Sequence, residues 1–141
     1  MRIYLDNCCF NRPFDDQTQL KIRLETEAKL HIQRQIMLGE VELVWSYILE
    51  FENNRNVDME VRNSIHGWKS VASVFCVEDE QIVTYAESLY RLGIKPHDAL
   101  HISCAFHSKA DYFITTDNKL INKKVTEIAI VNPLFFIGLE D

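Results

Sequence analysis

The chain alternates short apolar runs with longer segments in which apolar residues recur at helical spacing. Runs such as Ile3-Tyr4-Leu5 and Tyr112-Phe113-Ile114 predict buried strands, because a strand covered on both faces is apolar at every position. The clearest helical segment extends from Gln17 to Leu38 and stops at Gly39. Its predicted buried stripe, in steps of four residues, consists of Leu20, Leu24, Ala28, Ile32 and Ile36.

The whole pattern predicts the order β-α-β-α-α-β-α-α-β-α-β. Strands are expected at residues 2–5, 41–45, 71–77, 112–115 and 127–131, and helices at 17–38, 47–52, 57–69, 80–92, 96–109 and 118–122, with a loop at 6–16. Such an alternation predicts an α/β fold, a parallel sheet of about five strands flanked by helices on both faces. A length of 141 residues suits one domain, spanning 1–141, and the apolar tail from Pro133 is expected to pack on its core.

Composition narrows the class of protein. Hydrophobic residues make up 47% and charged residues 26%, which is ordinary for a folded chain, and no apolar run approaches the ~20 residues of a membrane span. The first residues meet Asp6 before a signal-peptide core could form, so we expect no membrane association and a cytoplasmic location. The four cysteines form no C-x-x-C pair and favour reduced, mostly buried thiols over a zinc or redox role.

The formal net charge of −6 argues against a protein that binds nucleic acid through bulk positive charge. It leaves room for an enzyme that touches a few phosphates through a metal and a local basic rim. Arg12, Lys95 and Lys119 lie near the ends of candidate motifs and either steady phosphates or serve as ordinary surface charge.

Two acids directly follow predicted strands, Asp6 after the first and Asp117 after the strand at 112–115. Ligand sites of open parallel sheets form at the carboxyl ends of strands, which is where these two residues would lie. Each also has a structural interpretation, Asp6 as a turn residue and Asp117 as a helix N-cap. A capping carboxylate keeps a second oxygen for a ligand, so the two roles of Asp117 are compatible.

Two further acids lie on predicted helices. Glu50 stands in an apolar stretch and either faces solvent or is buried with a partner, while Glu52, two residues on, competes for the role. Asp98 follows Pro96 in a helical first turn, where an acid also interacts favourably with the helix dipole. Like charges gathered in one cavity require either a cation that neutralises them or protons that stay bound, and the four acids point first to a divalent-metal site.

Other chemistries fit less well. His97 and His101 stand at i and i+4 as in a zinc-protease helix, but Asp98 replaces the glutamate base, and this interpretation leaves Asp6 and Asp117 without a role. The sequence has no G-x-G-x-x-G, P-loop or G-x-S-x-G motif. Cys8 stands where an aspartyl phosphatase needs its second Asp.

Four segments, in order, resemble the motifs of PIN-domain nucleases, a family that includes the toxin halves of many bacterial toxin–antitoxin pairs. They are Ile3-Tyr4-Leu5-Asp6-Asn7, Ser46-Tyr47-Ile48-Leu49-Glu50-Phe51, Asp98-Ala99-Leu100-His101-Ile102-Ser103-Cys104-Ala105 and Phe113-Ile114-Thr115-Thr116-Asp117. They span nearly the whole chain. Family members often carry Thr or Ser after the first acid, where this chain has Asn7.

The resemblance implies a single-domain, toxin-type ribonuclease whose four acids, Asp6, Glu50, Asp98 and Asp117, bind Mg²⁺ or Mn²⁺, supported by Asn7, Thr115 and His101. Such cations prefer carboxylate oxygens and activate water for in-line attack on phosphorus. It also implies an RNA substrate, an antitoxin partner and a homodimer. The alternatives are a PIN-like scaffold that binds a protein without turning over RNA, and a metal phosphatase or nuclease acting on DNA.

Overall fold

The computed structural model describes residues 1–139, in which five parallel strands form one sheet in the order β3-β2-β1-β4-β5. The strands are β1 (Arg2–Leu5), β2 (Glu42–Ser46), β3 (Val74–Cys76), β4 (Tyr112–Ile114) and β5 (Ala129–Val131). In register, Tyr4 at the centre of the sheet is paired with Val44 on β2 and with Phe113 on β4. The predicted parallel α/β sheet is thereby confirmed.

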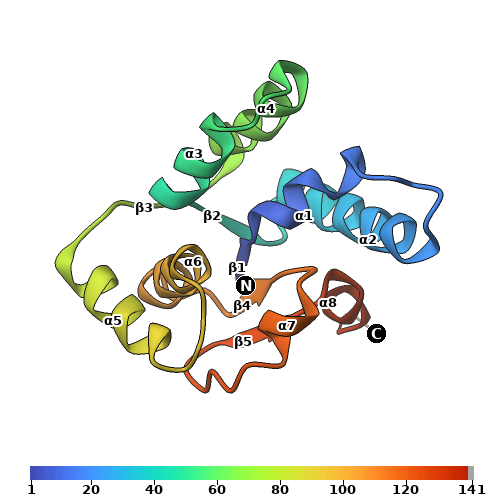
Figure 1. Cartoon of the computed structure of the whole chain (residues 1–141). Helices are drawn as coiled ribbons and strands as arrows, with labels where there is room; N and C mark the ends of the chain where they lie inside the picture. Colours follow the sequence, from blue (N-terminus) through green and yellow to red (C-terminus); the bar gives the residue numbers. More distant parts are fainter. Residues whose placement is uncertain (140–141) are drawn as a thin grey trace.

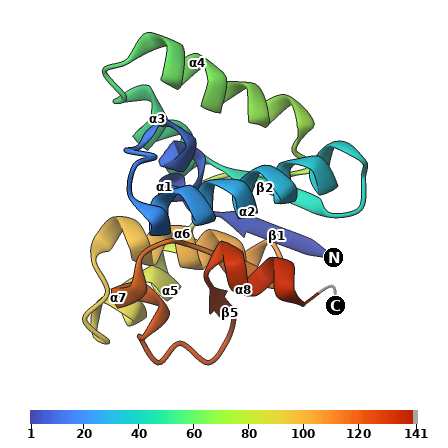
Figure 2. The same ribbon diagram turned by 90° about the vertical axis from the view of Figure 1, so that its right-hand side faces the viewer.

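Helices cover both faces of this sheet, with α5 and α6 on one side and α2 and α8 on the other (Figure 1). The helices are α1 (Asn7–Asn11), α2 (Leu20–Met37), α3 (Tyr47–Asn54), α4 (Met59–His66), α5 (Glu80–Tyr90), α6 (Pro96–His107), α7 (Asn118–Ile121) and α8 (Pro133–Gly138), with 3-10 turns η1 (Arg12–Phe14) and η2 (Gly67–Val71). Seen from the side, β1 runs from the N-terminus toward the face that Figure 1 presents to the viewer (Figure 2). Figure 1 therefore looks onto the carboxyl end of β1.

The core lies along the central strand. Ile3, Tyr4 and Leu5 are fully buried, as their apolar run predicts for a strand covered on both faces. The Tyr4 ring stacks on the ring of Phe113 from β4, with centroids 5.3 Å apart and planes inclined by 11°. Because each aromatic ring removes a large apolar area from water, this stack fixes the centre of the sheet firmly.

The buried face of α2 differs from the predicted stripe. Leu20 and Leu24 are 59% and 41% exposed, whereas Glu25 and Lys29 are buried. An α-helix turns through about 100° per residue, so each step of four residues advances the stripe by about 40° around the axis. The prediction was right for Ala28, Ile32 and Ile36 and wrong at the first two turns. The true face includes two charged residues that no hydrophobic pattern could identify.

The segment predicted as a loop at 6–16 contains α1 and η1 instead. Asp6 starts α1 as its N-cap, because its carboxylate accepts a hydrogen bond from the backbone N–H of Asn7. The strand predicted at 71–77 is shorter, since η2 occupies residues up to Val71. The apolar tail forms α8, whose Phe136 is buried as expected, while Phe135 is exposed. Among the helices described, none is long and apolar enough to cross a membrane.

Candidate functional site

The first and last acids of the series follow neighbouring strands, at the place where the chain changes its direction across the sheet. From β1 the chain proceeds to β2 on one side, and β4 later pairs with β1 on the other side. Asp6 and Asp117 follow these two neighbouring strands. In open α/β sheets this topological switch point opens a crevice at the carboxyl edge, and side chains there are placed to bind ligands.

Thr115 holds both of these acids. Its hydroxyl donates to Oδ2 of Asp6 at 2.8 Å and accepts a hydrogen bond from the backbone N–H of Asp117 at 3.1 Å. Asp6 is almost fully buried, and its Oδ1 accepts from the N–H of Asn7 at 2.8 Å. Asp117 caps α7, because its Oδ1 accepts from the N–H of Lys119 at 3.0 Å. Both carboxylates are thus oriented by the fold before any ligand arrives.

Asp98 shares the electrostatic environment of these acids from the first turn of α6. Burial raises the pKa of its carboxyl group above the ordinary value, and the nearby charge of Asp6 raises it further. Asp117 and Glu52 act in the same direction, whereas a protonated His101 opposes them. Three acids from other segments of the chain thus lie close enough to Asp98 to disfavour its charged form.

The two glutamates of α3 have different surroundings. The carboxylate of Glu50 accepts from the indole N–H of Trp45 at 2.8 Å and also pairs with His66 and Lys69, at 3.1 and 3.3 Å. Glu52 instead lies 2.7 Å from Nε2 of the buried His101. The structure thus brings together Asp6, Asp98, Asp117 and Glu52, and places the carboxylate of Glu50 among basic partners on α4 and η2.

Helical periodicity explains this difference. Ile48 and Leu49 are buried, and Glu52 follows them by four and three residues, which places it on the same inward face of α3. Glu50 stands two residues earlier and faces another side of the helix. The inward face could have been assigned from the sequence by treating Ile48 and Leu49 as the anchors of the helix.

A buried polar chain lies beneath the acids. Nδ1 of His101 lies 2.6 Å from the hydroxyl of Tyr4, which in turn lies 2.6 Å from Oγ of Ser46. Burial alone would lower the pKa of His101, but the hydrogen bond to Glu52 and the charges of Asp6, Glu52 and Asp98 raise it. Since both ring nitrogens have protein partners, the zinc-ligand role considered for His101 finds no free nitrogen.

Burial raises the pKa of Glu52, but the hydrogen bond and charge of His101, with His97 adding to them, bring the pKa below its ordinary value. Nδ1 of His97 lies 3.2 Å from the other carboxylate oxygen. Glu52 is therefore charged at neutral pH and is oriented by two histidines one helical turn apart on α6.

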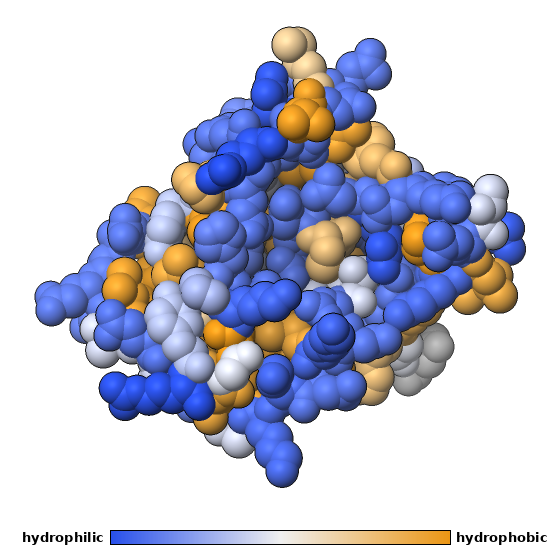
Figure 3. Space-filling view, viewed as in Figure 1, coloured by the Kyte–Doolittle hydropathy of each residue, from blue (hydrophilic) through white to orange (hydrophobic). Residues whose placement is uncertain are grey.

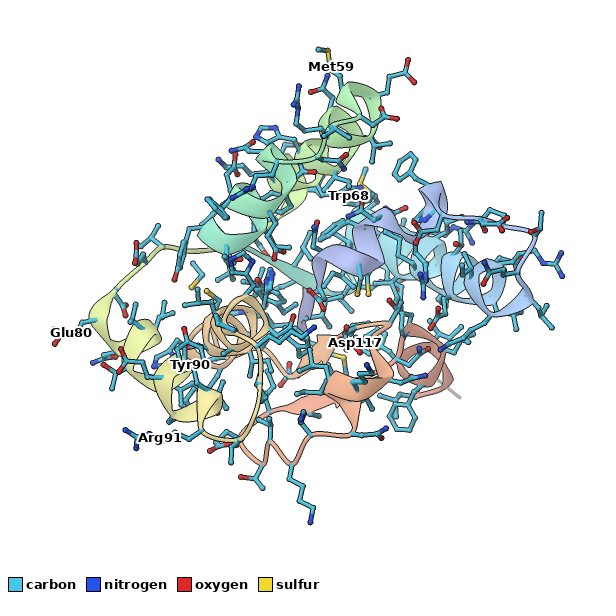
Figure 4. The ribbon with its side chains drawn as sticks, viewed as in Figure 1. Met59, Trp68, Glu80, Tyr90, Arg91 and Asp117 are labelled. Atoms are coloured by element: carbon cyan, nitrogen blue, oxygen red, sulfur yellow. The ribbon has the colours of Figure 1, made fainter. Side chains whose placement is uncertain are left out.

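Asp98 and Asp117 open into a hollow of about 130 Å³. Its lining is Gly93, Ile94, Lys95, Asp98, Asp117, Lys119, Leu120 and Lys123. Asp117 lies at the start of α7, below α1 in the view onto this edge of the sheet (Figure 4). The face seen in this view is largely hydrophilic, with hydrophobic side chains in small separate groups (Figure 3).

Two polar side chains next to Asp6, those of Cys8 and Asn7, also belong to the surroundings of the site. The thiol of Cys8, not considered as a site residue, donates to Asp6 at 3.5 Å and lies 3.3 Å from Oγ1 of Thr115. The side-chain oxygen of Asn7 is shielded from solvent and has no hydrogen-bond partner within the described chain. The one signal for Cys8 in the sequence was its position two residues after the first acid.

The donor set suits a hard divalent cation. Aspartate and glutamate oxygens are the ligands that Mg²⁺ and Mn²⁺ prefer. Burial raises the pKa of Asp98, and the negative charges of Asp6, Asp117 and Glu52, which a cation would offset, raise it further. Within residues 1–139, no three His, Cys, Asp or Glu side chains are arranged closely enough to form a ready-made metal cage. The fit is therefore one of donor chemistry and charge.

Comparison with solved structures supplies a relative of this architecture. VapBC2 from Rickettsia felis, determined bound to a DNA fragment from its promoter, superposes with a TM-score of 0.59, covering 94% of this chain and 98% of that one. VapBC2 is a PIN-domain toxin–antitoxin complex. The chain has a PIN-like fold. At 13% sequence identity the likeness shows the fold alone, and no protein-family model and no curated protein matches the sequence.

The PIN-like fold accounts for the order in which the sequence motifs occur. The motif around Asp6 ends the central strand, the motif around Asp117 follows its neighbour β4, and the remaining two motifs lie on α3 and α6. All four reach the same edge of the sheet from different parts of the chain. The roles of the acids in catalysis are a matter of proposal.

Proposed function

We propose that this protein is a metal-dependent ribonuclease whose site is centred on Asp6, Asp98 and Asp117. The observation that carries the proposal is the placement of these acids at the carboxyl edge of the sheet, where Thr115 holds Asp6 and Asp117, and Asp98 lines the same hollow as Asp117. Acids with no catalytic or binding role rarely accumulate in one crevice, because their repulsion destabilises the fold. A cation bound among these acids would attract each carboxylate and so offset their mutual repulsion.

Mg²⁺ or Mn²⁺ would be held by these three aspartates, with Glu52 as the fourth acid and Glu50 as the candidate that the sequence motif favours. When bound, such a cation supplies Lewis-acid stabilisation of charge on a phosphodiester and lowers the pKa of water. The chain supplies the orientation. Thr115 fixes the carboxylate of Asp6, and His101 fixes that of Glu52 through hydrogen bonds of 2.8 and 2.7 Å.

The likeness to VapBC2 supports a further part of the proposal, that the protein is the toxin of a toxin–antitoxin pair. An antitoxin protein would then be its partner, and RNA its substrate. We also propose a homodimer and a cytoplasmic location, both of which rest on the resemblance to toxin-type PIN nucleases.

Cleavage of a single-stranded RNA by the purified protein tests the proposal. We expect cleavage only with added Mg²⁺ or Mn²⁺, loss of cleavage with EDTA, and no cleavage by the Asp98→Asn variant. A single-stranded DNA of the same sequence serves as the comparison that separates ribonuclease from deoxyribonuclease. Cleavage of RNA by Asp98→Asn at the wild-type rate would contradict the assignment.

A second candidate function is a PIN-like scaffold that binds a partner protein without turning over RNA. The observation that favours it is the apolar surface of the packed pair α2 and α8, where Leu20, Leu24 and Phe135 are exposed. Titration calorimetry with Mn²⁺ discriminates between the two. Absence of binding at millimolar metal would favour the scaffold, and binding that Asp98→Asn abolishes would favour the nuclease.

A further inference from the structure

Three lysines gather at the hollow beside the acids. Lys95 comes directly before α6, Lys119 lies in α7, and Lys123 is the second residue after the end of α7. All three are exposed residues that line the same hollow as Asp98 and Asp117. A chain of net charge −6 thus concentrates positive charge at the edge of its acidic crevice.

The walls of the hollow differ in character. Ile94 and Leu120 are buried and form an apolar floor, 4% and 3% exposed. Gly93 has a positive φ of 83°, and a Cβ atom at this position would come to 3.5 Å from Nζ of Lys123. The ammonium group of Lys123 therefore lies over the backbone of Gly93, which is able to take this conformation without strain because it has no side chain.

Size and charge indicate the ligand. A volume of about 130 Å³ leaves room for one phosphate group, and the three ammonium groups favour an anion over an uncharged nucleobase. Lysine binds phosphate as a point charge from flexible positions, so three ammonium groups around one hollow suit a tetrahedral oxyanion. The acids in the same wall weaken this attraction without abolishing it, and a cation bound to them would strengthen it.

We propose that Lys95, Lys119 and Lys123 form a subsite for one backbone phosphate of single-stranded RNA, next to the phosphate at the metal centre. This subsite rests on the proposed nuclease function and adds to it the means by which an acidic protein holds a polyanion. The cation at the carboxylates would take one phosphate and the lysine hollow the adjoining one. The path of the strand across the carboxyl edge of the sheet is set by these two points.

The rival explanation is that the lysines only offset the charge of Asp98 and Asp117 in the metal-free protein. The two explanations differ in what the lysines affect. Phosphate binding makes RNA affinity depend on the lysines and on salt, because each neutralised phosphate releases counterions. Simple neutralisation makes Mn²⁺ affinity depend on them, since removing nearby positive charge tightens cation binding.

The test uses the full chain with Lys95, Lys119 and Lys123 all changed to Gln. The control carries Lys21→Gln, Arg23→Gln and Lys124→Gln, which remove the same charge from exposed positions outside the hollow. Binding of a fluorescent single-stranded RNA is followed by anisotropy in EDTA over a range of salt, so that no turnover is required. Mn²⁺ binding is measured separately by calorimetry.

We expect the hollow variant to bind RNA several-fold more weakly than the control, with a salt slope of log affinity that is shallower by about 0.7, the value for one phosphate of a single strand. Equal affinity and slope in the two variants would overturn the subsite, as would wild-type protein that fails to bind RNA at low salt. Tighter Mn²⁺ binding with RNA affinity equal to the control would support neutralisation instead. Lysine-dependent binding without any metal-dependent cleavage would leave the subsite standing and refute the nuclease.

Discussion

Nε2 of His101 lies 2.7 Å from Oε1 of Glu52, so an imidazole buried in α6 and a carboxylate on α3 form one hydrogen-bonded pair beneath the acidic crevice. The same nitrogen lies 3.9 Å from Oδ1 of Asp6. His101 is thus the point where the α3 acid, the β1 acid and the buried hydroxyl of Tyr4 meet. This relationship separates Glu52 from Glu50 and leads to the first prediction.

Glu52→Gln should reduce metal-dependent cleavage by roughly 10–100-fold, the range seen when a group that orients or binds at a metal site is lost. Glu50→Gln should reduce it far less, because the carboxylate of Glu50 contacts Trp45, His66 and Lys69. Both changes remove one negative charge from α3, so each is the matched control of the other. The reverse order of effects would return the role to Glu50.

The same pair of variants has a second readout in the His101 pKa, measured by NMR titration of the ring. Glu52→Gln removes the largest effect that raises this pKa, so the pKa should fall. Glu50→Gln should leave it near the wild-type value. An unchanged pKa in Glu52→Gln would show that the short contact to His101 does not persist in solution.

Asp98→Asn should raise the free energy of unfolding in EDTA at neutral pH while abolishing activity. The pKa of Asp98 is raised in the folded state, so its charged form is disfavoured there, and the wild-type protein gains stability as pH falls from the folded pKa toward the unfolded value. The variant lacks this pH dependence. Urea unfolding at several pH values measures both effects.

The same urea experiment with added Mn²⁺ tests whether Asp98 contributes to metal binding. A ligand that binds only the folded state stabilises it by RT ln(1 + [L]/Kd), so the wild-type protein should gain more from added Mn²⁺ than Asp98→Asn. Equal stabilisation of both proteins by the metal would place the cation elsewhere.

Arg12→Met should lower the free energy of unfolding by about 3–5 kcal/mol, because it leaves the fully buried carboxylate of Glu25 without a positively charged partner. Nε and Nη2 of Arg12 lie 3.0 and 2.9 Å from Oε1 of Glu25, and Asn132 donates to the other oxygen at 2.6 Å. The double variant Arg12→Met/Glu25→Leu should be less destabilised than the sum of the single changes. Urea unfolding of the four proteins gives the coupling energy.

The surface pair Arg2–Glu42, at 3.2 Å, is the matched control for this cycle. Both of its side chains are partly exposed, so its coupling should stay below about 1 kcal/mol. A coupling for Arg12 and Glu25 no larger than this would show that the buried pair does not hold η1, α2 and the start of α8 together.

Lys29→Met should flatten the rise in stability at alkaline pH. Burial lowers the pKa of Lys29 to about 8, and Nζ lies over the rings of Phe10 and Trp68, 5.4 and 5.5 Å from their centroids. Between this pKa and the ordinary 10.5 the unfolded state binds more protons, so the free energy of unfolding increases with pH by up to roughly 3 kcal/mol.

The measurement is the difference in unfolding free energy between wild type and Lys29→Met from pH 7 to 11. We expect Lys29→Met to be more stable than the wild type at pH 7, by an amount reduced by the cation–π interactions that the variant loses. The difference in unfolding free energy should shrink as pH rises. Lys21→Met, at an exposed position of α2, should show no such trend. A constant difference would mean that Lys29 titrates at its ordinary value.

The amino-acid sequence by itself determined the order of the five strands and of the helices between them apart from α1, and the positions of Asp6 and Asp117 at strand ends. These features depend on local patterns, since an apolar run followed by an acid marks a strand end in any parallel sheet. Asp98 was also located correctly in the first turn of a helix, because Pro96 marks that helix start.

Tertiary packing decided which side of α2 faces the core. The burial of Glu25 and Lys29 on α2, and the hydrogen bond between Glu52 on α3 and His101, depend on partners that are distant in the sequence. A charged residue becomes buried only where the fold supplies its partner, and the sequence does not state which partner will be there. The lysine hollow could not be identified from the sequence for the same reason, because it forms only where the start of α6 and the segment around α7 lie side by side.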